Sequence, residues 1–148
     1  MSEDLIKKGP ERVGAARLLE ANGLPSSDLT DTHMEDFFYC GSASAPVGIV
    51  GLEFCEEDAL LRSLVVAPAS RRAGLGAALV DRAEEHARSR GSRLVFLLTT
   101  TAENFFKRRG YASAERASAP WAIRSSREFS DLCPASSAFM SKRIQPDR

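Results

Sequence analysis

The segment from Leu64 to Leu79 constrains the fold of this chain more than any other. It reads as an apolar strand, a polar turn with glycines at 74 and 76, and the start of a helix. A helix start presents backbone N–H groups without partners at the positive end of the helix dipole, which together form an anion site. Because glycine has no side chain, an anion can approach these amides closely. The segment therefore predicts a phosphate-binding loop between a strand and a helix.

Two nucleotide-binding classes do not fit this loop. No Gly-Lys-Ser/Thr follows, as a P-loop requires, and Leu79 stands where the third glycine of the dinucleotide fingerprint belongs. A flexible turn with incidental arginines is the alternative interpretation.

The elements around the loop predict an α/β (α+β) fold. Three strands that follow one another closely favour an antiparallel meander. The run 94–98 lacks alternation, so we expect a strand that is buried on both faces and parallel to the strand before the long helix. A capping box from Thr100 to Glu103 predicts a short helix. The expected helices are 11–21, 75–91, the capping-box helix and 125–132, and residues 26–28 are expected to form a cap or turn. The expected strands are 37–40, 47–55, 60–67, 94–98, one from Tyr111 onward and one at 138–140. Residues 1–148 are thus expected to form a single domain, with a mixed, mostly antiparallel sheet of about six to seven strands and helices on both faces.

The composition excludes several classes of protein. The 148 residues carry 20 Lys and Arg against 20 Asp and Glu, a balance that argues against a nucleic-acid partner. No apolar run is long enough for a membrane span, and the first residues lack the apolar run of a signal peptide, so no membrane partner and a cytoplasmic location are expected. Three cysteines without CxxC spacing fit a reducing compartment and predict no metal site.

The zero net charge conceals a division along the chain. Residues 28–58 contain eight acids and no Lys or Arg, whereas residues 59–102 contain seven arginines against three acids. Oppositely charged stretches are expected where different regions face oppositely charged ligands, although an ordinary solvated surface is the simpler interpretation.

The motifs carry a family resemblance. The spacing Arg71-x-x-Gly74-x-Gly76 after Leu64-x-Val66-x-Pro68 resembles the acetyl-CoA signature of GCN5-related N-acetyltransferases (GNAT). Residues 60–66, 97–106 and 128–134 resemble the small acetyltransferases associated with arsenic-resistance operons. The Thr-rich block and residues 107–111 are also similar to the acetyltransferase domain of N-acetylglutamate synthase.

The resemblance implies a GNAT-type domain, acetyl-CoA as cosubstrate and a set of contacts to it. The strand Leu64–Val66 would pair with the pantetheine arm, and a backbone N–H near Val65 or Val66 would polarise the thioester carbonyl. The expected cofactor-binding residues are Leu64, Val65, Val66, Arg71, Arg72, Ala73, Gly74, Leu75, Gly76, Ala77, Asn104, Phe105 and Phe106. Asn104 is included because the asparagine usual after the central strand is replaced by Thr99.

The resemblance also implies catalytic groups. Glu53 is the candidate base, since partial burial would raise its pKa toward neutrality; an ordinary surface glutamate is the alternative. The tyrosine that usually protonates the leaving thiolate is replaced by Phe106, so we expect water to serve, and Tyr111 does not substitute by position.

Arg62, Ser63 and Thr100 are the candidate residues for the acetyl acceptor. An arginine in an apolar strand is costly to bury without an anion, and a substrate carboxylate would provide one. Together with the resemblances this favours a small amino acid or a glutamate-like compound, including an organoarsenical. The alternative is an internal ion pair of Arg62 with Glu53 or Asp58.

Two other functions remain open. The replacement at Phe106 is compatible with an acyl-CoA sensor that does not turn over, and Cys40, Cys55 and Cys133 could bind trivalent arsenic. The expected partner is a small-molecule amine, and a homodimer is left open. His86 is expected to be a surface residue, His33 to have no partner at ligand spacing, and Trp121 to be a packing residue.

Overall fold

The computed structural model describes residues 6–126, 129 and 137–145, without the side chains of residues 72 and 73. Its strands are β1 (Lys7–Lys8), β2 (Phe37–Gly41), β3 (Pro46–Cys55), β4 (Asp58–Val66), β5 (Leu94–Thr99), β6 (Ala112–Ser113) and β7 (Ala138–Arg143). Its α-helices are α1 (Arg12–Ala21), α2 (Leu75–Ser89), α3 (Glu103–Arg108) and α4 (Trp121–Arg124), and its 3-10 helices are η2 (His33–Asp36), η3 (Pro68–Ala73) and η4 (Arg116–Ser118).

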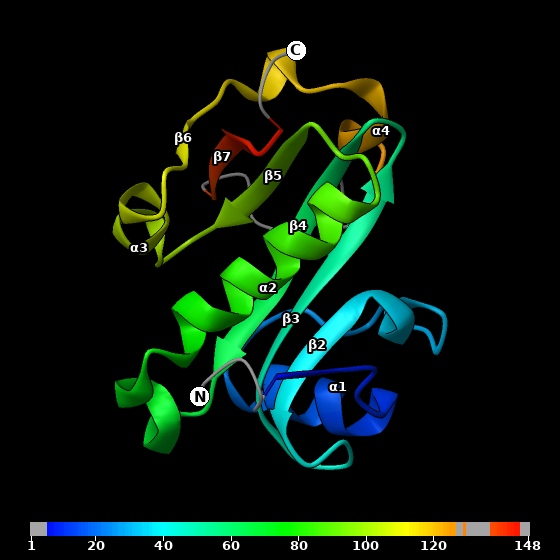
Figure 1. The fold of residues 1–148 in the computed structure, drawn as a ribbon, viewed down its shortest axis with the longest axis vertical. Coiled ribbons are helices and arrows are strands. Elements are labelled where there is room, and N and C mark those ends of the chain that lie inside the picture. Colours follow the sequence, from blue (N-terminus) through cyan, green and yellow to red (C-terminus); the bar gives the residue numbers. More distant parts are fainter. Residues whose placement is uncertain (1–5, 127–128, 130–136, 146–148) are drawn as a thin grey trace.

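The seven strands form one mixed sheet in the order β1-β2-β3-β4-β5-β7-β6 (Figure 1). β2, β3 and β4 form the expected antiparallel meander, and β4 and β5 are the parallel pair, joined through α2. The C-terminal strand β7 lies between β5 and β6 and is antiparallel to both. The predicted α/β class, the mixed sheet and the parallel pair are confirmed.

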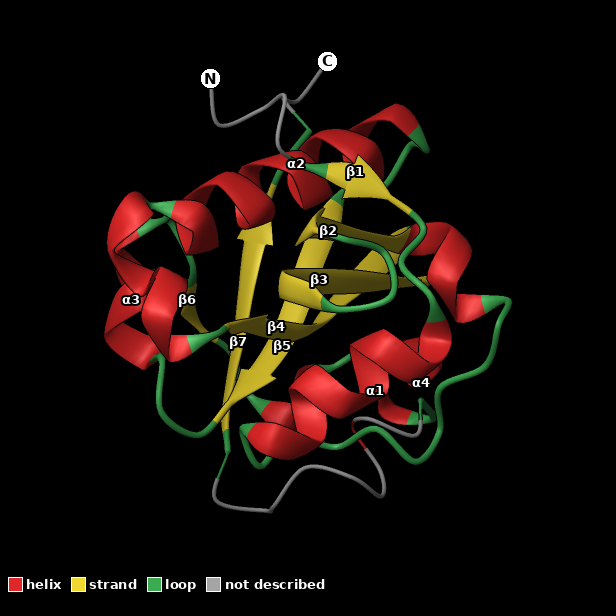
Figure 2. Cartoon of the chain, turned by 90° about the horizontal axis from the view of Figure 1, so that it is seen from below, coloured by secondary structure: helices red, strands yellow, loops and turns green. Residues whose placement is uncertain are grey.

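Helices cover both faces of the sheet (Figure 2). α2 and α3 pack on one face, where Leu79 and Phe106 belong to the largest apolar cluster. α1 packs on the other face through Ala15 and Leu19, and α4 packs beside it through Ile123 in a separate cluster. Because side chains alternate along a strand, Leu52 points toward α2, whereas its neighbour Glu53 points toward α1 and α4.

β4 contains a bulge that opens the sheet. Its pairing with β3 shifts by one residue between Val65 and Arg62, and Ser63 inside the bulge has a left-handed φ of 61°. β4 pairs with β5 only at Ala59 and Leu60, before the bulge. Beyond the bulge the two parallel strands therefore diverge.

One local prediction needs correction, and another lies mostly outside the described residues. The capping box is wrong: α3 begins at Glu103 after Ala102, whose N–H donates to Thr99 Oγ1, so Thr99 and not Thr100 closes this turn. The helix predicted at 125–132 falls mostly outside the described residues and stays a prediction, and α4 ends before that range, at Arg124. Among the described residues, no helix is both long enough and apolar enough to cross a bilayer.

Candidate functional site

A cavity of about 900 Å³ lies where β4 and β5 diverge. It extends from the start of α2 along β4 to the bulge, and α3 closes one side. Its wall contains twelve of the residues expected from the sequence: Arg62, Ser63, Leu64, Val65, Val66, Arg71, Gly74, Gly76, Ala77, Thr100, Phe105 and Phe106. The structure thus brings most of the predicted cofactor and acceptor residues to one cavity.

The loop at one end of the cavity has the geometry expected of an anion site. η3 leads into Gly74, whose left-handed φ of 71° allows the chain to turn into α2. The amides of Leu75, Gly76 and Ala77 form the first turn of α2, where no acceptor is available within the helix. Arg71 fixes this loop, because its Nε donates to Val66 O at 2.8 Å and its NH2 to Asn22 Oδ1 at 3.3 Å.

Among the described side chains, three expected ones are not in the cavity wall. Glu53, the candidate base, is one of them, and its carboxylate contacts the wall residue Arg62. The Leu75 side chain is buried in the core beneath α2, so only its backbone can serve an anion. Asn104 lies exposed on α3, outside the wall. The side chains of Arg72 and Ala73 lie outside the described part of the chain.

The strand register decides which amides of β4 face the cavity. The Ala67 N–H donates to Val47 O on β3. Every second residue of an antiparallel strand directs its N–H and C=O toward the same neighbour, so Val65, which is paired with Ile49, also directs its backbone groups toward β3. Val66 therefore points the other way, as its carbonyl bonded to Arg71 indicates, and Leu64 lies on the same side. Of the two expected thioester donors, Val65 therefore faces β3, and Val66 faces the cavity.

An ionic cluster lies beside the bulge on the α1 face. The Arg62 side chain is fully buried, and its NH1 donates to Asp28 and to Glu53, each at 2.5 Å. Its NH2 donates to Asp28 at 2.8 Å and its Nε to Ser63 Oγ at 3.0 Å. The internal ion pair with Glu53 is therefore present, and Asp28 is a second partner that the sequence did not indicate.

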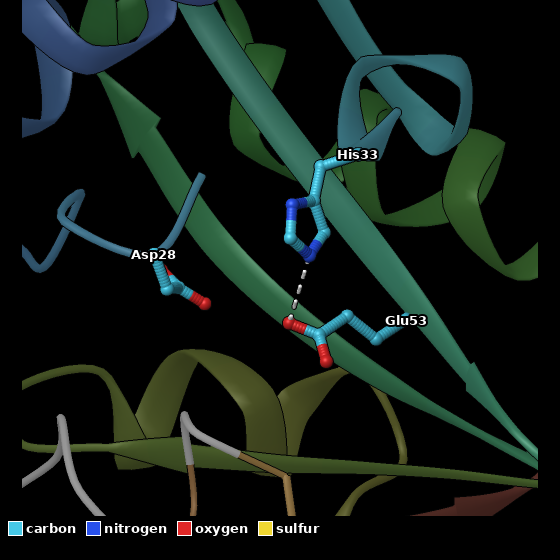
Figure 3. A group of neighbouring side chains, drawn as sticks. All are labelled: Asp28, His33 and Glu53. Carbon is cyan, nitrogen blue, oxygen red and sulfur yellow. Dashed lines mark ion pairs between the residues drawn. The ribbon is translucent and has the colours of Figure 1, made fainter. Parts of the chain in front are cut away.

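His33 completes this cluster (Figure 3). Its Nε2 lies 3.7 Å from Glu53 Oε2, and its Nδ1 accepts the backbone N–H of Thr30 at 3.0 Å. Asp28, His33 and Glu53 each direct a potential ligand atom toward a common point. Arg62 NH1 already contacts both carboxylates, so a metal ion at this point would have to displace the guanidinium.

The charge of Arg62 changes the titration of its partner. Burial alone would raise the pKa of Asp28, but the hydrogen bonds and positive charge of Arg62 outweigh burial and hold that pKa below its ordinary value. Asp28 is therefore a carboxylate at neutral pH.

The structure also reveals Ser137, which the sequence did not single out. Ser137 is buried, lies in the cavity wall, and its Oγ has no hydrogen-bond partner among the described residues. A buried hydroxyl without a partner costs about 1–3 kcal/mol. Ser137 and the loop from Asn22 to Pro25 extend the wall beyond what the motifs predicted. Asp28 and Ser137 lie far in sequence from the phosphate-binding loop and from β4, and only the fold brings them close to these elements.

No tyrosine of α3 faces the cavity. Phe106 is buried in the wall and has no hydroxyl. The Tyr111 hydroxyl instead donates to Glu84 at 2.9 Å, and Lys142 binds the same carboxylate at 3.0 Å. Burial, reinforced by Glu84, raises the pKa of Tyr111 far above its ordinary value. Tyr111 therefore binds Glu84 in the core, in agreement with the expectation that it does not replace the missing tyrosine.

The arrangement of the cysteines weakens the arsenic-binding alternative. Cys40 packs in the cluster beneath α2, whereas Cys55 packs against the cluster beneath α4 on the opposite face. Burial, with help from Glu53, raises the pKa of Cys55 to about 11. Cys133 lies outside the described residues. Cys40 and Cys55 therefore cannot share one ion.

Three further expectations were wrong. His33 lies in the ionic cluster, and His86 is half-buried between Phe38 and Phe54, with its Nε2 3.1 Å from Asp36. Trp121 is 76% exposed and does not pack in the core. The sequence spacing of His33 and His86 gave no indication of their contacts with Glu53 and Asp36.

Comparisons with known proteins agree with this fold. Residues 6–111 match the model of the Acetyltransferase (GNAT) family. An uncharacterized N-acetyltransferase of Chlorobaculum tepidum is 35% identical over 85 residues, which are 57% of this chain and 54% of that protein. The chain thus matches about half the length of this curated relative.

Two solved structures show the same fold. N-acetylglutamate synthase from Neisseria gonorrhoeae, complexed with coenzyme A and N-acetyl-glutamate, superposes with a TM-score of 0.77 at 22% identity, over 95% of this chain and 35% of that one. An aminoglycoside 6'-N-acetyltransferase complexed with coenzyme A superposes with a TM-score of 0.71 at 16% identity, over 97% and 98% of the two chains. The family model matches most of the chain, and the matched residues form this sheet and most of the cavity wall. The chain therefore belongs to the GNAT family of acetyltransferases.

Proposed function

We propose that the protein transfers an acetyl group from acetyl-CoA directly to the amine of a small molecule. The observation that carries this proposal is the cavity between the diverging strands β4 and β5. It joins an anion site at the start of α2 to a polar end at Arg62 and Ser63, which are the two ends that such a reaction needs.

The cofactor would lie along β4. The amides of the first turn of α2 and the Arg71 side chain would bind the pyrophosphate, through charge-assisted hydrogen bonds. The pantetheine arm would replace β5 as the partner of β4 beyond the bulge. The amide of Val66 or Leu64 would donate to the thioester carbonyl oxygen and stabilise the negative charge that develops there.

The reaction needs a neutral amine, because an ammonium group has no lone pair. Glu53 would accept one proton from the acceptor ammonium. The amine nitrogen then bonds to the carbonyl carbon, the carbon–sulfur bond breaks, and the electron pair leaves on sulfur. A second proton leaves the nitrogen and the thiolate takes one from solvent, so the products are an N-acetyl amide, CoA thiol and one released proton.

The leaving group explains why Phe106 is tolerable in the place of a tyrosine. A thiol has a pKa of about 8.5, so it can depart as a thiolate without an acid beside it. Water at the cavity mouth then protonates the sulfur.

The acceptor would be a small-molecule amine. A glutamate-like compound, including an organoarsenical, is the finer candidate from the family resemblances, and a synthase of N-acetylglutamate is among the similar folds. The other support for such an acceptor was a substrate carboxylate on Arg62, but Asp28 and Glu53 already bind this guanidinium. A role in arsenic resistance depends on that acceptor. The acetyltransferase domain would span residues 1–148.

The test is thiol release from acetyl-CoA with a broad panel of amines, including glutamate and amino-bearing organoarsenicals. We expect release above the background hydrolysis rate with at least one class of amine, and loss of this release in Glu53→Gln. The matched control is Glu57→Gln, an exposed acid whose Oε1 pairs with Arg93 outside the cavity. No release with any amine would overturn the proposal.

A non-catalytic acyl-CoA sensor is the second candidate, and Phe106 is the observation that favours it. Calorimetry distinguishes the two: a sensor binds acetyl-CoA without releasing thiol in the presence of any amine, and Glu53→Gln leaves its affinity for acetyl-CoA unchanged.

A further inference from the structure

The backbone of Ser63 has a conformation that serine rarely adopts. Its φ of 61° lies in the left-handed region, where a side chain is strained. The bulge accounts for the turn of the chain at this position but not for the serine, because glycine adopts the same φ without strain. Strained residues of this kind cluster at functional sites, so the Ser63 side chain is a candidate for a specific role.

The Ser63 hydroxyl is oriented by the buried side chain of Arg62. Arg62 Nε carries one hydrogen and donates it to Ser63 Oγ at 3.0 Å. The hydroxyl hydrogen of Ser63 cannot point back at Nε, which offers no lone pair, and the contacts of the described residues give it no acceptor. Donation by a guanidinium also polarises the O–H bond and strengthens it as a donor. Ser63 therefore has one oriented donor without a partner among the described residues.

This donor belongs to the wall of the cavity. Ser63 and Leu64 are consecutive residues of the bulge, and both line the cavity. The Leu64 amide lies on the cavity side of β4, as the register of the strand requires, so one stretch of wall carries a backbone donor and a side-chain donor. Oxyanion holes combine backbone N–H groups with side-chain hydroxyls in this way.

We infer that Ser63 is a catalytic residue, whose hydroxyl donates a hydrogen bond to the carbonyl oxygen of the thioester beside the amide donor of β4. The inference rests on the proposed acetyl transfer and assigns a further donor to its reacting group. Negative charge develops on this oxygen when the amine nitrogen bonds to the carbonyl carbon, and a donor already fixed by Arg62 does not need to reorient at that moment. The hydroxyl keeps its proton throughout, and no covalent bond of Ser63 forms or breaks.

The first test removes the hydroxyl. Ser63→Ala and Ser63→Gly should both lower kcat for thiol release by at least about tenfold, because the hydrogen bond strengthens as charge develops on the oxygen. The KM for acetyl-CoA should change by less than about twofold. Glycine also relieves the left-handed strain, so its variant should have the higher Tm of the two and remains informative if the alanine variant does not fold. An unchanged kcat in either folded variant would overturn the inference.

Two control variants separate the hydroxyl from the backbone. Glu56 is the other described non-glycine residue with a left-handed φ, at 58°, and it lies in the turn between β3 and β4, outside the cavity wall. Glu56→Gly should raise the Tm and leave kcat unchanged. Ser113→Ala removes an exposed serine side chain of β6 and should change neither quantity. A comparable fall in kcat for either control would overturn the assignment to the Ser63 hydroxyl.

A modified substrate identifies the atom that Ser63 binds. In the dithioester analogue of acetyl-CoA, sulfur replaces the carbonyl oxygen and accepts hydrogen bonds only weakly. The loss of kcat in Ser63→Ala should therefore shrink to less than about threefold with this analogue. An equal loss with both substrates would place the hydroxyl at another atom or in a structural role, and would overturn the inference.

Failure of this inference differs from failure of the proposed function. If the native chain releases no thiol with any amine of the panel, the transferase proposal fails and the role of Ser63 fails with it. If the native chain releases thiol and the Ser63 variants release it equally fast, only the assignment to Ser63 is wrong.

Discussion

A buried guanidinium is stable only where anions surround it, and Arg62 meets that condition inside the chain. Among the described residues, its partners include Asp28 from the loop after α1, Glu53 from β3 and Ser63 from the bulge of β4. Removing one partner of such a cluster leaves an uncompensated buried charge, which costs more than the pair itself contributes. The cluster therefore connects the position of the loop that lines the cavity to the bulge that opens it.

The stability of this pair should depend on pH in one direction. Because the pKa of Asp28 is lower in the folded than in the unfolded chain, its contribution is present above about pH 4 and is lost as pH falls through the folded value. We expect Asp28→Ala to lower the free energy of unfolding by about 3–5 kcal/mol at neutral pH, and by less near pH 3. Urea denaturation measures both values. Asp31→Ala, at an exposed pair, should cost less than about 1 kcal/mol at either pH; a cost for Asp28→Ala that stays constant with pH would contradict the assignment.

Replacing Ser137 should affect ligand affinity and stability in opposite directions. Removing a buried hydroxyl that lacks a partner should leave the ligand-free protein unchanged or more stable, whereas removing a hydroxyl that binds a ligand weakens that ligand. Ser137→Ala should therefore maintain or raise the Tm of the free protein and lower its affinity for CoA or for the acceptor by about fivefold to tenfold. Thermal denaturation and calorimetry on the same sample test this, and a lower Tm with unchanged affinities would show a purely structural hydroxyl.

At the scale of elements, the turn into α2 depends on two glycines that serve different purposes. Gly74 has a left-handed φ with open space around its Cα, so alanine there is strained by its backbone. Gly76 is inside the helix, where an added methyl group would lie at an ordinary distance from Phe105. One glycine sets the direction of the chain, and the other leaves the amides of the first turn accessible.

These roles predict opposite effects on stability. Gly74→Ala should destabilise the protein by about 1–2 kcal/mol, because of the left-handed backbone. Gly76→Ala should stabilise it by up to about 1 kcal/mol, because alanine favours a helix over glycine. Both variants should bind CoA more weakly, the second because its methyl group lines the cavity. Chemical denaturation and calorimetry check the two effects, and tight CoA binding by Gly76→Ala would place the pyrophosphate elsewhere.

At the scale of the whole molecule, local patterns predicted the sheet and most of the cavity wall. Apolar periodicity and turn residues located the meander, the parallel pair and α2, because these depend on neighbours in sequence. The resemblance of residues 64–76 to a known motif located the anion site. The Arg62 cluster could not be assigned, because the partner at Asp28 is 34 residues away and only tertiary packing brings it close. Ser137 and His86 were missed for the same reason.

The position of β7 predicts a further global property. β7 provides both the second partner of β5 and the attachment of β6, so deleting residues 138–148 should expose an apolar strand edge and prevent folding. Circular dichroism and size-exclusion chromatography of the truncated chain should show loss of the cooperative transition and aggregation. A soluble, cooperatively folding truncated chain would contradict this prediction. Deleting only residues 146–148 is the control, and it should leave the transition in place.

The same strand order has a consequence for biosynthesis. A ribosome releases the N-terminal part first, so β1 to β4 can pair while the rest is still being made. The position beside β5 is filled by β7, which emerges after the other six described strands, and β6 can pair only once β7 is in place. On the newborn polypeptide, β5 therefore keeps one edge unpaired until β7 has emerged, and during that interval the exposed edge is open to pairing with other chains.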